Sequence, residues 1–69
     1  MTKTIDARGL SCPQPVIMTC AAITAGEFPF EVLLETVTAR ENVRRAAERA
    51  ACAVRVEQSG DEFKLTISK

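Results

Sequence analysis

The sequence predicts an α/β (α+β) fold, a two-layer sandwich in which two helices cover one face of a four-stranded mixed sheet. The chain has 69 residues, which suits a single domain spanning residues 1–69. Two segments of helical periodicity alternate with segments of strand character, and a tight-turn sequence joins the last two strands. The element order is therefore βαβαββ, and right-handed crossovers place both helices on the same face of the sheet.

The first strand is predicted at residues 2–7, where a single isoleucine lies among mostly polar residues, as in an edge strand. The letters ARGL then turn the chain. The first helix is predicted from Pro13 to about Ala25, and Gly26 ends it.

Helical spacing gives this helix an apolar stripe that should face the sheet. The stripe consists of Val16, Cys20 and Ile23, with Ile17 beside it. Cys20 is therefore expected in the core. Met18 points away from the stripe, where it is either a contact for a partner or simply an exposed side chain.

The segment FEVLLETV at residues 30–37 begins with alternating apolar and charged residues and is predicted to be a central strand. Thr38, followed three residues later by Glu41, is a capping-box pattern that opens a helix running to about Ala51. Small apolar side chains on one side of this helix allow it to approach the sheet closely. They are Ala39, Val43, Ala46, Ala47 and Ala50.

Two strands at residues 53–58 and 62–68 are predicted to form an antiparallel hairpin. The letters SGD at residues 59–61 supply the turn between them. Three apolar residues alternate with polar ones in the last strand, so this strand should bury one face. They are Phe63, Leu65 and Ile67.

The segment GLSCPQP, residues 9–15, places a cysteine directly before two prolines at the predicted helix start. With Cys12 as the N-cap, Pro13 and Pro15 occupy first-turn positions whose N–H groups a helix leaves unpaired, so both prolines are tolerated. The N–H of Gln14 is then the remaining early donor near the Cys12 sulfur, and a helix N-terminus favours an anion. We therefore expect a lowered pKa for the Cys12 thiol and a reactive thiolate.

No histidine is present to act as a base, so any side-chain assistance to the thiolate must come from Arg8. The alternative interpretation is that Cys12 is a small apolar cap without chemistry. Cys20 lies two turns away, about 12 Å along the helix axis, which excludes a disulfide between these two cysteines. Cys52, at the end of the second helix, is expected to be a boundary or core residue.

Composition excludes several classes of protein. Nine basic residues balance nine acidic ones, which argues against nucleic-acid binding. Three cysteines without a CxxC pair, in a chain that lacks histidine, indicate no metal site, and we expect no cofactor. No apolar run is long enough to span a membrane, and the first residues lack the apolar core of a signal peptide, so a cytoplasmic protein is expected.

Four arginines gather on the second predicted helix, namely Arg40, Arg44, Arg45 and Arg49. At helical spacing Glu41 can pair with Arg45, and Arg44 can pair with Glu48. This pattern favours a solvated face over a docking patch.

The stretch DARGLSCPQP resembles the TusA/SirA family of small sulfur-carrier proteins, whose motif has the form D-x-x-G-x-x-C-P-x-P. Every motif position is matched, by Asp6, Gly9, Cys12, Pro13 and Pro15. The resemblance covers essentially the whole chain, and residues 39–67 are similar in pattern to the YedF-like branch of the family.

The resemblance implies the sheet order 1-2-4-3, with the last strand antiparallel to the others. It also implies a sulfurtransferase-like carrier in which Cys12 holds sulfur as a persulfide. The donor would be a cysteine desulfurase or a rhodanese-type enzyme, and the acceptor another protein. The residues around the thiol are then candidate binding residues, namely Arg8, Gly9, Pro13, Gln14 and Pro15.

Two alternatives use the same surface. One is a non-catalytic interaction or regulatory module, and the other is a selenium-handling carrier that uses the same cysteine. The sequence is compatible both with a free-standing carrier and with the N-terminal part of a two-domain protein.

Overall fold

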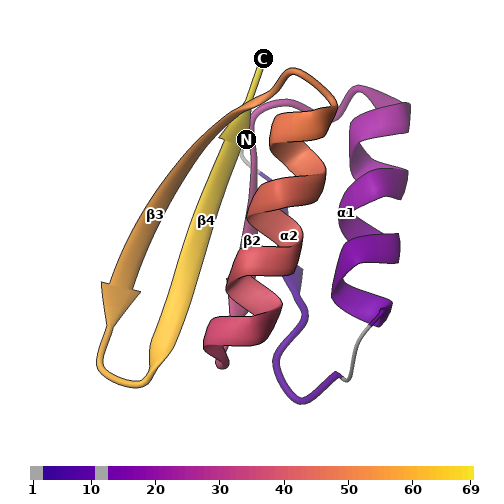
Figure 1. Cartoon of the computed structure of the whole chain (residues 1–69). Coiled ribbons are helices and arrows are strands. Elements are labelled where there is room, and N and C mark those ends of the chain that lie inside the picture. The colour runs from indigo at the N-terminus through magenta and orange to yellow at the C-terminus, as the bar shows by residue number, and fades with distance from the viewer. Residues whose placement is uncertain (1–2, 11–12) are drawn as a thin grey trace.

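Four strands and two helices follow one another along the chain in the predicted order βαβαββ (Figure 1). The structure, a computed structural model, describes residues 3–10 and 13–69. Its elements are β1 (Lys3–Asp6), α1 (Gln14–Ala25), β2 (Phe30–Leu34), α2 (Val37–Arg49), β3 (Ala53–Ser59) and β4 (Glu62–Ser68).

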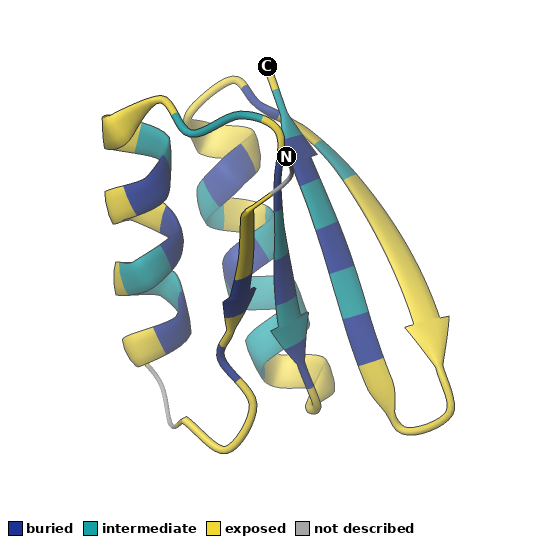
Figure 2. Cartoon of the chain, turned by 180° about the vertical axis from the view of Figure 1, so that it is seen from behind, coloured by how far each residue is buried: buried dark blue, intermediate teal, exposed yellow. Residues whose placement is uncertain are grey.

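The strands form one sheet in the order β1-β2-β4-β3. β1 runs parallel to β2, whereas β4 is antiparallel to both of its neighbours, β2 and β3. Both helices cover the same face of this sheet, as Figure 1 and the reverse view in Figure 2 show. The predicted strand order, strand directions and two-layer arrangement are therefore confirmed.

The core lies between the two central strands and the helices. In β2 and β4 every second residue is buried, because alternate side chains of a strand point to opposite faces of the sheet. The register sets Val32 opposite Leu65 and Phe30 opposite Ile67, so the buried side chains of the two strands stand side by side. The alternation predicted for the last strand is confirmed, whereas β3, at the edge of the sheet, is exposed along most of its length.

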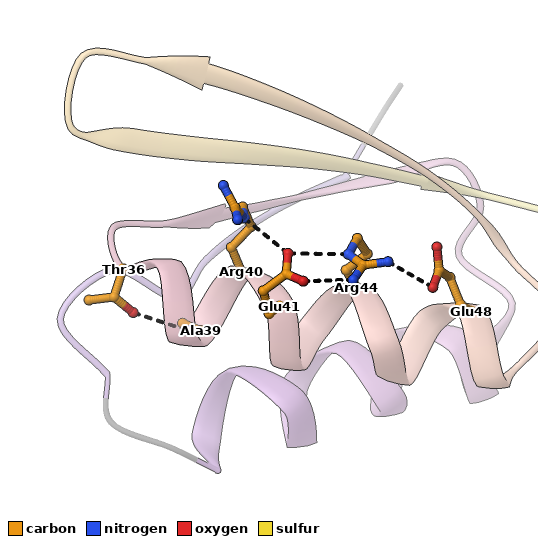
Figure 3. A network of polar contacts seen from close by, with 6 residues as sticks. All are labelled: Thr36, Ala39, Arg40, Glu41, Arg44 and Glu48. Carbon is orange, nitrogen blue, oxygen red and sulfur yellow. Dashed lines mark hydrogen bonds and ion pairs between the residues drawn. The ribbon is translucent and has the colours of Figure 1, made fainter.

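β2 ends at Leu34, earlier than predicted, because Thr36 already caps the following helix. The backbone of Thr36 is extended, and its hydroxyl accepts a 3.1 Å hydrogen bond from the N–H of Ala39 (Figure 3). The capping-box prediction at Thr38 is therefore wrong, since that residue lies inside the first turn of α2. Val37 belongs to the helix as well, although its β-branched side chain favours a strand.

α2 ends at Arg49 with Ala50 as its C-cap, close to the predicted end. The predicted core face is confirmed at its centre, where Val43 and Ala47 are fully buried. Ala50 is exposed, contrary to the prediction, because it follows the last helical turn.

The side of α2 that faces the β3–β4 hairpin carries a network of charged side chains (Figure 3), in which the Arg40 guanidinium lies 4.8 Å from the centre of the Phe63 ring. Glu41 accepts hydrogen bonds from Arg44 at 2.6 Å and from Arg40 at 3.2 Å, and Arg44 also reaches Glu48 at 3.0 Å. The hydrogen bond from Arg44 lowers the pKa of the Glu41 carboxyl. The predicted pair between Arg44 and Glu48 is confirmed. The predicted pair between Glu41 and Arg45 is wrong, because Arg44 and Arg40 take both oxygens of that carboxylate.

The stripe predicted for α1 is confirmed only in part. Val16 and Ile23 are half-buried and pack against the core, whereas Cys20 and Ile17 are exposed, contrary to the prediction. The fully buried residues of the helix are Pro15, Thr19 and Ala22. Met18, expected to point away from the core, is half-buried and packs against it. Apolar residues occur on every side of this helix, so their spacing does not select one face. Thr19 is tolerated in the core because its hydroxyl donates a 2.8 Å hydrogen bond to the carbonyl of Pro15.

The predicted hairpin between β3 and β4 is confirmed. Ser59 pairs with Glu62 across a two-residue turn, in which Gly60 takes a φ of 60°. Cys52, just before β3, is buried and belongs to the core, which confirms the expectation of a boundary or core residue. Neither helix in the described part of the chain has the length and apolar character needed to cross a membrane.

Candidate functional site

The predicted motif occupies the loop between β1 and α1, at the end of the sheet where β1 and β2 both stop (Figure 1). These two strands are parallel, with Asp6 opposite Leu33, so the residues that follow each strand meet at this end. The N–H of Ala7 continues the pairing with a 3.0 Å hydrogen bond to the carbonyl of Leu33. The loop is therefore built directly on two strands of the sheet.

A cluster of three charged residues, Asp6, Arg8 and Glu62, holds the beginning of this loop in place. The Asp6 carboxylate accepts hydrogen bonds from the Arg8 side chain at 2.8 and 2.9 Å and from the Arg8 backbone N–H at 3.1 Å. The Arg8 guanidinium also donates to Glu62, the first residue of β4, at 3.0 Å. Hydrogen bonds from the Arg8 side chain lower the pKa of Asp6 to about 2, and the same contact raises the pKa of Arg8. The Arg8 charge is shared between two carboxylates, and its assistance to Cys12 stays a prediction.

Replacing Asp6 with asparagine is expected to remove part of the acid sensitivity of the fold. The folded-state pKa of about 2 lies below the ordinary value of 3.8, so the folded protein binds fewer protons than the unfolded chain between these values. The stabilisation is complete above pH 3.8 and is lost as the pH falls toward 2. Urea unfolding at several pH values measures the free energy of unfolding. The difference in this free energy between wild type and Asp6→Asn should shrink as the pH falls from 3.8 toward 2.

The matched control for this measurement is Asp61→Asn, in the hairpin turn and outside the cluster. Added salt should also reduce the difference in the free energy of unfolding between wild type and Asp6→Asn, because the Asp6–Arg8 pair is exposed to solvent and salt screens it. If Asp6→Asn and Asp61→Asn show the same pH dependence, the cluster does not stabilise the loop.

Gly9 brings the middle of the loop against the residue that follows β2. Its φ of 77° lies in the left-handed region, which favours glycine. Its N–H donates a 2.6 Å hydrogen bond to Oε1 of Glu35. Sequence reasoning missed both Glu35 and Glu62 as supports of the loop. The parallel pairing of β1 and β2 is the signal that would have placed Glu35 here, whereas nothing in the local sequence marks Glu62.

α1 begins one residue later than predicted. Pro13 is the N-cap, because its ψ of 19° lies outside the helical range, and its carbonyl accepts the N–H of Ile17 at 3.0 Å. Gln14 and Pro15 are the first two helical residues. The prediction that the prolines start the helix is confirmed, while Pro13 takes the cap position that was assigned to Cys12.

Cys12 itself lies outside the described residues, so its exposure, contacts and thiol pKa stay predictions. The first turn of α1, directly downstream, offers the backbone N–H groups of Gln14 and Val16 and carries no acidic side chain. Gln14 is exposed to solvent, whereas the next residue, Pro15, is fully buried. Pro15 therefore fixes the first turn of α1 to the core, and Gln14 stays on the surface. This end of α1 presents partial positive charge.

An apolar hollow of about 160 Å³ opens beside the motif, between the first turns of the two helices. Leu10 of the loop and Pro15 and Val16 of α1 line it, together with Thr36 and Ala39 around the start of α2. This hollow was not predicted, because its walls come from segments that are far apart in the sequence. It offers a place for an apolar side chain of another molecule.

The structure brings the five candidate binding residues to one end of the molecule, around the β1–α1 loop and the start of α1. They are Arg8, Gly9, Pro13, Gln14 and Pro15. Among residues 3–10 and 13–69, no three histidine, cysteine or acidic side chains come together as a metal site would require. A helix N-terminus held by a braced loop is suited to an anionic group.

Comparison with known proteins agrees with this architecture. The structure is similar to the crystal structure of a SirA-like protein from Desulfitobacterium hafniense, with a TM-score of 0.85, 28% sequence identity, and coverage of 96% of this chain and 95% of that one. No curated protein gave a significant match. The family model described as sulfurtransferase TusA matches residues 3–69. Because that match spans almost the whole chain, the protein belongs to the TusA family of sulfur carriers.

Proposed function

We propose that Cys12 is the residue that carries sulfur, and that it accepts sulfane sulfur from a donor protein as a persulfide and passes it to an acceptor protein. Membership of the TusA family supports a role in sulfur relay with other proteins. The observation that carries the assignment is the start of α1 at Gln14, two residues after Cys12. The positive end of that helix therefore follows Cys12 closely in the sequence.

The transfer is a pair of displacements at sulfur. In the first, the Cys12 thiolate attacks the outer sulfur of a donor persulfide. The new S–S bond forms as the old one breaks, and the donor cysteine leaves as a thiolate. In the second, a nucleophile of the acceptor attacks the outer sulfur on Cys12, and the Cys12 thiolate leaves. Each step conserves atoms and charge, and no external oxidant or reductant takes part.

The first turn of α1, which follows Cys12 in the sequence, suits both anions in this cycle. A thiolate and a persulfide anion are each favoured by a helix N-terminus, and the first turn of α1 adds no acidic side chain that would repel them. The donor class that fits is a cysteine desulfurase or a rhodanese-type enzyme, since both present sulfur as a cysteine persulfide. A reducing cytoplasm is the compartment that keeps such a thiol free.

Incubation with a cysteine desulfurase, cysteine and pyridoxal phosphate, followed by intact-mass measurement, tests the assignment. Wild type should gain one sulfur atom, and Cys12→Ser should gain none. Cys20→Ser and Cys52→Ser are the matched controls, because one removes an exposed thiol and the other a buried one, and both should still load.

Two results would remove the assignment. One is a sulfur gain that survives in Cys12→Ser, and the other is a wild-type protein that never gains sulfur. Circular dichroism of each variant verifies that the fold is intact, so that lost loading reports on the thiol itself.

A further inference from the structure

The arginines of α2 fall into two groups that the sequence did not separate. Arg40 and Arg44 are neutralised within the network shown in Figure 3. Arg45 and Arg49 are exposed, and neither forms an ion pair with any residue in the described part of the chain. Among the other described cations, Lys3, Arg8, Arg55 and Lys64 pair with carboxylates, whereas Lys69, far along the chain from α2, does not.

These two arginines line a groove that leads to the motif. They are four residues apart, so they stand about 6 Å from each other along the same side of α2. Pro13 and Val16, from the start of α1, line the same groove. The groove therefore runs between the helices, with uncompensated positive charge on α2 and the residue after Cys12 on α1.

The groove also joins the apolar hollow beside the loop. Val16 of α1 and Asn42 of α2 line both spaces. The combined surface is apolar near Leu10 and Ala39 and cationic near Arg45 and Arg49. Such a surface is complementary to a segment that carries carboxylates beside an apolar side chain.

We propose that this surface, the α1–α2 groove, docks an acidic segment of the protein that delivers sulfur to Cys12. This proposal rests on the carrier function of Cys12 and adds where the donor is held and which chemistry recognises it. Carboxylates of the donor pair with the guanidinium groups of Arg45 and Arg49, and an apolar residue of the same segment enters the hollow. The donor persulfide is thereby presented at the start of α1.

A protein segment suits this surface better than a nucleic acid. The chain has nine basic and nine acidic residues, and only two cations stand unpaired in the groove. A phosphate backbone is bound by extended rows of cations, which are absent from the described part of this face. The apolar hollow at the other end of the groove offers no positive charge that would bind a phosphate group.

The test compares two double charge reversals that alter the net charge equally. Arg45→Glu/Arg49→Glu changes the groove, and Arg55→Glu/Lys69→Glu is the matched control. Arg55 projects from the exposed edge strand β3 with 81% of its side chain accessible, and Lys69 lies at the exposed end of the chain. Two rates are measured for each protein: sulfur loading from a cysteine desulfurase, and alkylation of Cys12 by neutral iodoacetamide, which needs no docking.

The groove variant should load sulfur from the desulfurase roughly tenfold more slowly than wild type, with iodoacetamide alkylation unchanged. Wild-type loading should fall as salt is added, and loading of the groove variant should not, because its steering charges are gone. The control variant should behave as wild type. Arg45→Gln/Arg49→Gln, which places no acidic residue in the last turn of α2, should show a smaller loss in the same direction.

Equal desulfurase-dependent loading of wild type and the groove variant overturns the docking proposal and leaves the carrier function standing. Absence of loading in wild type removes the carrier function, and the docking proposal with it. If the groove reversal leaves sulfur transfer unchanged but abolishes binding of a labelled single-stranded RNA in fluorescence anisotropy, the groove is a nucleic-acid site and the proposal is wrong.

Discussion

Replacing Leu65 with alanine is expected to lower the free energy of unfolding by about 3 kcal/mol, enough to leave a domain of this size close to unfolding. Leu65 is completely buried on β4, opposite Val32 on one side and Val56 on the other. The helices cover this face of the sheet, so the truncated side chain leaves a cavity that its neighbours cannot fill. Urea unfolding followed by circular dichroism measures the loss.

Leu33→Ala is the matched control. It removes the same atoms from β2, but Leu33 points to the sheet face away from the helices and is only half-buried. This variant should cost about 1 kcal/mol or less. Equal losses at Leu33 and Leu65 would contradict the assignment of the core to the helix-covered face.

Replacing Gly9 with alanine is expected to cost about 1 kcal/mol of stability and to slow desulfurase-dependent sulfur loading several-fold. The φ of 77° is strained for any residue with a Cβ, although the added methyl would meet Glu35 only at an ordinary 3.9 Å. Relief of that strain moves the loop and its hydrogen bond to Glu35, and with them the segment that leads to Cys12. Unfolding and loading are measured on the same preparation.

Gly60→Ala separates strain from function. Gly60 has a φ of 60° and open space around it, and it lies in the β3–β4 turn, outside the motif. This variant should lose a similar amount of stability while its loading rate stays at the wild-type value. If Gly60→Ala slows loading as much as Gly9→Ala does, then the effect comes from general destabilisation and the loop has no special role.

The sheet was predictable from the sequence because its central strands bury alternate residues. The Phe63, Leu65 and Ile67 alternation is confirmed in full, and the SGD letters mark the turn that precedes it. The strand order itself came from the family resemblance, since antiparallel and parallel neighbours cannot be ordered from periodicity alone.

The buried face of α1 was not predictable in the same way. Cys20 is as apolar as Ala22, and only the position of the sheet decides that the latter is buried. Thr19 enters the core because a local hydrogen bond satisfies its hydroxyl, which a hydrophobic pattern does not register. The N-cap was missed for a related reason: Thr36 and Thr38 both suit that role, and the end of β2 selects between them.

The motif could be recognised in the sequence, but most of the hydrogen bonds that hold its loop in place could not. Asp6 and Arg8 are two residues apart, so their contact is local. The hydrogen bonds from Gly9 to Glu35 and from Arg8 to Glu62 span 26 and 54 residues. Contacts of that range follow from the topology of the sheet, which must be known before they can be inferred.

The central place of β4 has a consequence for how the protein matures on the ribosome. Since β4 separates β2 from β3, a nascent chain that stops before residue 62 has no strand to join the two parts of the sheet. The hydrogen bond from Arg8 to Glu62 also cannot form until this last segment has been synthesised. The β1–α1 loop therefore gains its contact with β4 only after synthesis reaches the last strand.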